Sequence, residues 1–67
     1  MRESERVMFL VELKEIVINK AVPLWIQDGI SKEIMIQAVF NKGRPKGLQK
    51  RFAEEWVDLG MEKANAG

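Results

Sequence analysis

The side chains of this sequence that could do chemistry are mainly cations, and they are concentrated in one stretch. Between Ile34 and Ala53 there are five Lys and Arg residues and no acidic residue. The whole chain has 11 Lys and Arg, 10 Asp and Glu, and a net charge of +1, so the remainder is net negative. A one-sided cationic patch on a nearly neutral chain is typical of a surface that binds an anion.

We expect this surface to consist of the cations of the segment 42–51 and one amide side chain. The candidate nucleic-acid-binding residues are Lys42, Arg44, Lys46, Gln49, Lys50 and Arg51. Pro45 suits the first turn of a helix, which predicts Lys46, Gln49 and Lys50 in the first turns of the last helix. Free N–H groups and the positive end of the helix dipole attract phosphate there. A merely solvated surface, or contact with an acidic protein surface, is the alternative.

Catalysis is not expected, because the residues that usually carry it are missing. The 67 residues include no Cys, His or Tyr, which excludes disulfides, thiolate or imidazole metal ligands, and a nucleophile activated by His. Glu54 and Glu55 are neighbours and diverge on a helix, while Glu12 and Glu15 share a face typical of solvated carboxylates. We therefore predict no enzyme, no metal and no cofactor.

The hydrophobic pattern predicts an all-α fold of three to four helices in a single domain, residues 1–67. The first helix is expected over residues 3–20 with Ser4 as its cap, and the second over 32–41 with Ser31 as its cap. Pro23 predicts a kink or break in the connection near residues 21–22. The last helix is expected to begin at Pro45 and to end near Gly60, which leaves residues 61–67 as a frayed tail.

The apolar residues of the first two main helices exceed what a small monomer should conceal. A seam of Val7, Val11 and Ile18 lies beside the main apolar stripe of the first helix, and the helix over 32–41 is apolar nearly all round. Adding Ile36 and Phe40 gives five candidate interface residues, and we expect an intertwined or packed homodimer. For residues 7–20 a pair of β-strands is the alternative to a helix, but no Gly, Pro or Asn-Gly interrupts this segment to form a hairpin turn.

Three short motifs resemble known families. Gly43-Arg44-Pro45-Lys46, preceded by Lys42, resembles the core of an AT-hook, which lies in the narrow minor groove of A·T-rich DNA. The run Gly-Arg-Pro-Lys-Gly-Leu at residues 43–48 is similar to segments that precede DNA-binding helices in recombinases and phage regulators. Both resemblances imply contact with DNA.

The third resemblance implies a protein partner instead. Ala38-Val39, followed by Pro45-x-x-Leu48-x-x-x-Phe52-x-Glu54, is similar to the last helical hairpin of the theta accessory subunits of bacterial replicative polymerase. That small three-helix family binds the proofreading exonuclease subunit.

Two functions follow as expectations. The first is a small DNA-binding or DNA-associated regulatory protein of the phage or mobile-element type, with duplex DNA as its partner. The alternative is a helical protein-interaction module, an adaptor, inhibitor or accessory subunit that docks on a larger protein. The mixed charges at the N-terminus do not resemble a signal peptide, and four charged residues interrupt the apolar run of residues 7–26, so we expect a cytoplasmic protein without a membrane segment.

Overall fold

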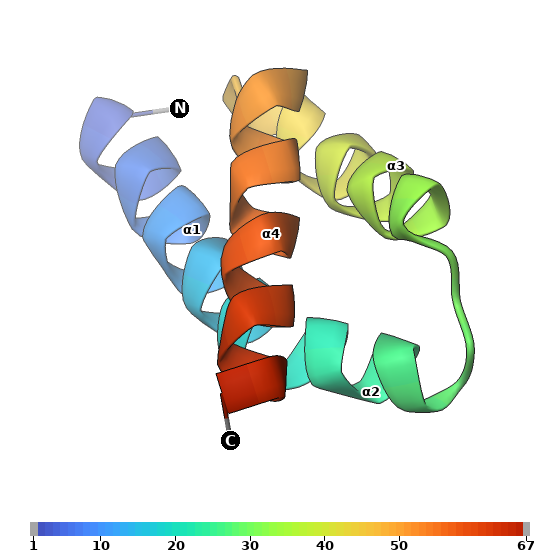
Figure 1. Ribbon diagram of the computed structural model, residues 1–67. Helices are drawn as coiled ribbons and strands as arrows, with labels where there is room; N and C mark the ends of the chain where they lie inside the picture. The colour runs from blue at the N-terminus through green and yellow to red at the C-terminus, as the bar shows by residue number, and fades with distance from the viewer. Residues whose placement is uncertain (1, 67) are drawn as a thin grey trace.

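The computed structural model describes residues 2–66, and in that part of the chain every regular element is helical. The predicted all-α class is confirmed. The elements in chain order are α1 (Glu3–Ile16), η1 (Val17–Ala21), α2 (Val22–Gln27), α3 (Lys32–Gly43), η2 (Arg44–Lys46) and α4 (Lys50–Ala66). In Figure 1, α4 crosses in front of α1 and α3, and α2 leaves the lower end of α1 in a new direction.

The change of direction between α1 and α2 has a local cause in Pro23. Its ring lacks an N–H and would crowd the carbonyl of Asn19 in a regular α-helix. The five residues of η1 form a wider π-helical turn instead, and the N–H of Val22 donates to the carbonyl of Val17. The chain therefore bends while it stays helical on both sides of Pro23, and Pro23 lies in the first turn of α2, where its missing N–H costs least.

The two predicted caps have different outcomes. The Ser31 hydroxyl accepts a hydrogen bond from the N–H of Ile34 at 3.4 Å, so this cap is confirmed. The Ser4 cap is wrong, because α1 already begins at Glu3 and no side chain caps it.

The boundaries of the last helix also differ from the prediction. Pro45 lies in the short η2 turn, and Gly47 then takes a left-handed conformation with φ of +93°, so α4 begins only at Lys50. At the other end, α4 continues through Gly60 to Ala66. Residues 61–66 are thus helical, and Met61 packs against the core, so the predicted frayed tail is wrong for the described residues.

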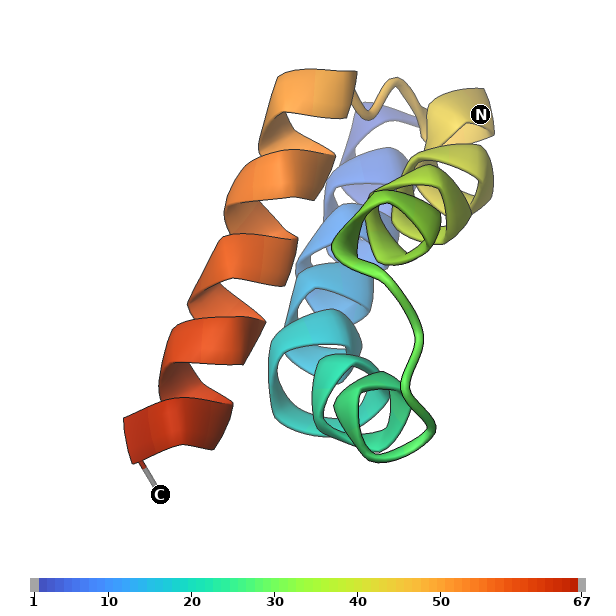
Figure 2. The same cartoon turned by 45° about the vertical axis from the view of Figure 1, so that its right-hand side comes forward.

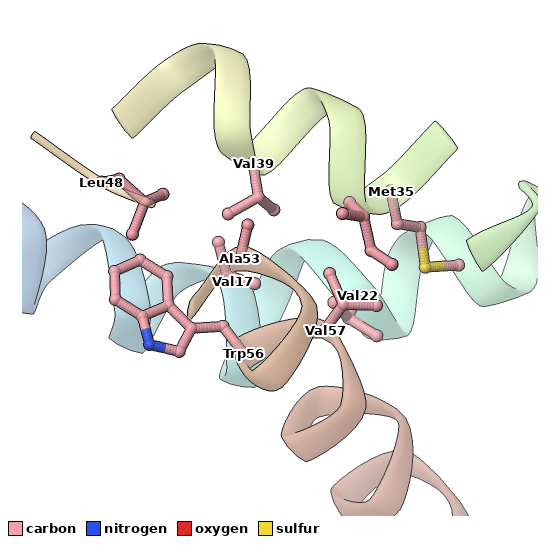
Figure 3. Close-up of a cluster of buried hydrophobic side chains, with 9 residues drawn as sticks. Val17, Val22, Met35, Val39, Leu48, Ala53, Trp56 and Val57 are labelled. Carbon is pink, nitrogen blue, oxygen red and sulfur yellow. The ribbon is translucent and has the colours of Figure 1, made fainter. Parts of the chain in front are cut away.

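The core lies where α4 crosses η1, α2 and α3 (Figure 3). Its buried members are Val17, Val22, Met35, Ile36, Val39, Leu48, Ala53, Trp56 and Val57. The spacing of Leu48, Phe52, Trp56 and Leu59 predicts an inward stripe for the last helix. This prediction is only half right, since Phe52 is 40% exposed and Leu59 is 36% exposed. The face of α4 that enters the core is centred on small residues, Ala53 and Gly60, which allow the neighbouring helices to approach closely.

Candidate nucleic-acid interface

One end of the molecule gathers the cations of four elements. The N-terminal end of α1, the last turn of α3, η2 and the first turn of α4 all lie at the upper end in both views (Figures 1 and 2). We call this surface the basic end, and it consists of Arg6, Lys42, Arg44, Lys46, Gln49, Lys50 and Arg51.

Arg6 is the member that sequence reasoning missed. It comes from α1, about forty residues before the predicted segment, yet its guanidinium lies beside the turn at Gly47. A Cβ added at Gly47 would lie 3.7 Å from the Arg6 Nη1 atom. No local sequence pattern predicts that Arg6 lies close to Gly47, because this contact arises from the packing of α1 against η2. The nearest carboxylate contact of Arg6, to Glu3 at 3.9 Å, is long and exposed, so it neutralises little of the charge.

The turn between α3 and α4 is held in place by short-range contacts. The N–H of Leu48 donates to the carbonyl of Gly43 at 3.0 Å, and the buried Leu48 side chain covers Gly43 so closely that a Cβ there would be 2.5 Å from it. The N–H of Gly47 donates to the carbonyl of Arg44, also at 3.0 Å. These contacts fix the backbone that presents Arg44 to solvent.

Lys46 is tied to α1 rather than free in solvent. It is half-buried, and its ammonium lies 5.6 Å from the centroid of the Phe9 ring. A cation–π contact at such a site contributes about 0.5–1 kcal/mol, which is enough to favour this position of the side chain. Lys46 therefore helps to join η2 to α1, and its charge adds to the local potential without reaching far from the surface.

The first turn of α4 carries Lys50 and Arg51 and no acidic residue. Cations at this end oppose the helix dipole, so their presence costs stability and has no structural rationale of its own. Lys50 lines a groove of about 320 Å³ between α3 and α4 together with Glu33 and Glu54, which partly compensate its charge. Arg51 lies over the exposed ring of Phe52, 5.0 Å from the ring centroid. Arg51 is therefore the better placed of the two for an external anion.

The remainder of α4 is acidic on its exposed side. All four carboxylates of α4 are exposed and follow its cationic first turn along the helix: Glu54, Glu55, Asp58 and Glu62. Asp58 pairs with Lys32 of α3 at 2.5 Å, and this hydrogen bond, followed by the charge of Asp58, raises the pKa of Lys32. A helix with this charge pattern is repelled along most of its length by a polyanion, whereas its first turn is attracted.

The predicted interface residues do not form one surface. Val7 and Val11 are 49% and 53% exposed, and Ile18 is half-buried on the same side of the helix. Ile36 is buried in the chain's own core at 7% exposure, so it is not available to a partner. Phe40 is half-buried and packs against the same core. The core-facing side of the helix over 32–41 is thus covered by the chain itself.

No protein-family model matches the chain, and no curated protein or solved structure matches it at a significant level. Among residues 2–66, none of the helices has both the length and the apolar content that a bilayer crossing requires. In the same residues, no group of three or more carboxylates is arranged so that it could hold a metal ion.

Proposed function

We propose that this chain is a small, non-enzymatic, DNA-associated regulatory protein that binds the phosphate backbone of duplex DNA through the basic end. The observation that carries the proposal is the convergence of cations from four elements on one end of the molecule, among them Arg6 from α1. Arg44 and Arg51 are exposed and can each form bidentate hydrogen bonds with a phosphate.

The charge distribution on α4 favours one mode of binding. Its first turn is cationic, and the acidic side that follows disfavours laying the helix along the major groove. In addition, residues 44–49 separate α3 from α4, which is longer than the turn of a usual helix-turn-helix. We therefore place the end of α4 and the η2 turn on the backbone, with little reading of base edges.

A single basic end is small, so the proposal includes a homodimer. The α1 seam, defined as the exposed Val7 and Val11 of α1 with the half-buried Ile18 of η1, borders a hollow of about 280 Å³ that is also lined by Lys14 and Glu15. In a two-fold dimer the same patch meets itself, so Lys14 of one copy can face Glu15 of the other. Two basic ends on one dimer would double the number of phosphates contacted.

Salt-dependent binding of a labelled duplex tests the proposal. With about four phosphates contacted by one chain, the slope of log K against log salt is about −3.6, which is about a hundredfold loss of affinity between about 50 and 200 mM salt. Arg44→Gln should weaken binding and reduce the slope by about one. Lys63→Gln removes the same charge near the C-terminal end of α4, where Lys63 contacts Asn19, and should leave binding unchanged.

Absence of binding at low salt would overturn the proposal, as would equal effects of the two substitutions.

The second candidate, a helical module that docks on a larger protein, is favoured by a different observation. Several large apolar side chains stay exposed on the folded chain, among them Val11, Ile16 and Ile34. This candidate predicts a stable complex that does not depend on duplex DNA.

A further inference from the structure

An apolar groove lies between two walls formed by α1–η1–α2 and by α3. It encloses about 310 Å³, and among residues 2–66 its lining comes from these elements, with none from α4. Leu13, Ile16 and Trp25 line one wall, and Ala38 and Lys42 line the other. The groove is distinct from the α1 seam, which lies on another side of the same helix.

The walls of the groove are more exposed than core packing explains. Ile16 is 51% exposed although it lines the groove. Ile34 is 60% exposed and lies one turn before Ala38 on the same face of α3, so it extends that wall. Ala38 is small and exposed, which leaves room for another backbone to approach. A partner seated here would remove several large apolar surfaces from water.

The lining also restricts the kind of occupant. Apart from Lys42, every side chain that lines the groove is apolar. An extended segment would bury backbone N–H and C=O groups against walls that offer them almost no partners, and that costs free energy for each group. A helix satisfies its own backbone and presents only side chains, so a helix is the occupant that this lining suits.

The charge of the lining favours a partner helix that carries a carboxylate. Lys42 is the one charged lining residue among residues 2–66, and no carboxylate of these residues forms an ion pair with it. It lies in the last turn of α3 and also belongs to the basic end. A carboxylate carried by the occupant can pair with the Lys42 ammonium. A second copy fits less well, because an α1 seam seated in this groove makes a heterologous contact that does not close a two-fold dimer, and the seam carries Lys14 as well as Glu15 beside Val11 and Ile18.

We propose that this groove binds an amphipathic helix of a partner protein, with apolar residues at i, i+3, i+4 and i+7 and a carboxylate that pairs with Lys42. The proposal does not rest on DNA binding, since Ala38, Ile16 and Trp25 lie outside the basic end, although the groove and the basic end share Lys42. It assigns the groove to a different protein and the basic end to an anion.

Selection from a displayed library of 16-residue helical peptides tests this proposal. Peptides that bind the folded chain should share the apolar spacing and one acidic position, and Ala38→Trp, which fills the groove from an exposed site, should weaken them at least about tenfold. Leu59→Gln changes an exposed apolar residue of α4, which does not line the groove, and it should leave peptide affinity unchanged.

The Lys42 contact is tested by a charge exchange. Lys42→Glu should weaken the selected acidic peptide about tenfold, and replacing the acidic residue of the peptide with Lys should restore binding to this variant. The proposal would be overturned if the selected peptides bound the Ala38→Trp variant and the parent chain with equal affinity. It would also be overturned if the selected peptides shared no acidic position. A homodimer that Ala38→Trp dissociates would assign the groove to a second copy instead. Duplex affinity of Ala38→Trp should stay at the parent value, because Ala38 lies outside the basic end.

Discussion

Gly60 of α4 packs directly against the side chain of Val22, at the junction of η1 and α2. A Cβ built on Gly60 would lie 2.8 Å from the Val22 Cβ, and Val22 is completely buried. The bend that Pro23 imposes therefore delivers a β-branched side chain to the one position on α4 that has no side chain. This contact brings α4 close to η1 and α2, and it explains a glycine in the middle of a long helix.

Gly60→Ala should destabilise the fold despite the better helix propensity of Ala. Overpacking costs about 1–3 kcal/mol, which exceeds the gain of about 1 kcal/mol for replacing Gly inside a helix. Urea unfolding of the variant measures the difference. In the Val22→Ala background the same substitution should cost less, because the opposing methyl groups are gone. A more stable Gly60→Ala protein would show that the two elements can separate at no cost.

The Gly60 contact also shows why sequence periodicity misplaced the inward face of α4. Spacing alone selects the large residues Leu48, Phe52, Trp56 and Leu59, and it gives no weight to Ala53 or Gly60. In the structure the closest helix contacts occur at the small residues, so the buried face is rotated and Phe52 is left at the edge. Helix identity and the Ser31 cap depend on local patterns, and these were predictable.

The candidate site was predictable only in part for a related reason. The segment 42–51 shows its charge in the sequence, but Arg6 joins it through the packing of α1 against η2. The apolar groove likewise depends on the angle between α1 and α3, which no spacing rule provides. The same helix over 32–41 that reads as uniformly apolar is divided by that geometry into a core side, with Met35 and Val39, and an open side, with Ile34.

Gly47→Ala should destabilise the chain by about 1 kcal/mol, because a residue with a Cβ is strained at positive φ. Gly29 provides a matched control, since its φ is also positive, at +75°, and no atom lies within 4 Å of a Cβ built there. Gly29→Ala should lower the free energy of unfolding by a similar amount. Only Gly47→Ala should also weaken DNA binding, because Gly47 lies next to Arg6 and Arg44 in the basic end. Parallel losses of DNA affinity in both variants would contradict this assignment.

The Lys32–Asp58 pair predicts a contribution to stability that is lost at high pH. The hydrogen bond to Asp58 raises the pKa of Lys32 in the folded state above its ordinary value of 10.5. The contribution is therefore complete below pH 10.5 and disappears as the pH rises through the folded-state pKa. The unfolding midpoint of the parent chain should fall more steeply than that of Lys32→Met between about pH 9 and pH 12. Identical pH profiles would mean that the pair makes no difference to folding.

Val11→Glu should dissociate the proposed dimer while leaving the helical fold intact. Val11 is exposed on the single chain, so its replacement removes no core contact, but it places two carboxylates against each other across a two-fold interface. Light scattering over a concentration series compares the parent chain with the variant. Circular dichroism checks that the variant stays helical. A parent chain that is monomeric at the highest concentration would contradict the dimer.

Arg6→Gln should weaken duplex binding although Arg6 lies far from the basic segment in the sequence. If its guanidinium beside Gly47 contacts a phosphate, the substitution removes one counterion-releasing contact and reduces the salt slope by about one. Arg2→Gln makes the same charge change at the N-cap of α1, four residues away and one turn further from the η2 contact, and should have the smaller effect. Filter binding at two salt concentrations ranks the two variants. If both have the parent slope, α1 contributes nothing to the interface, and the anion-binding surface consists of residues 42–51 alone.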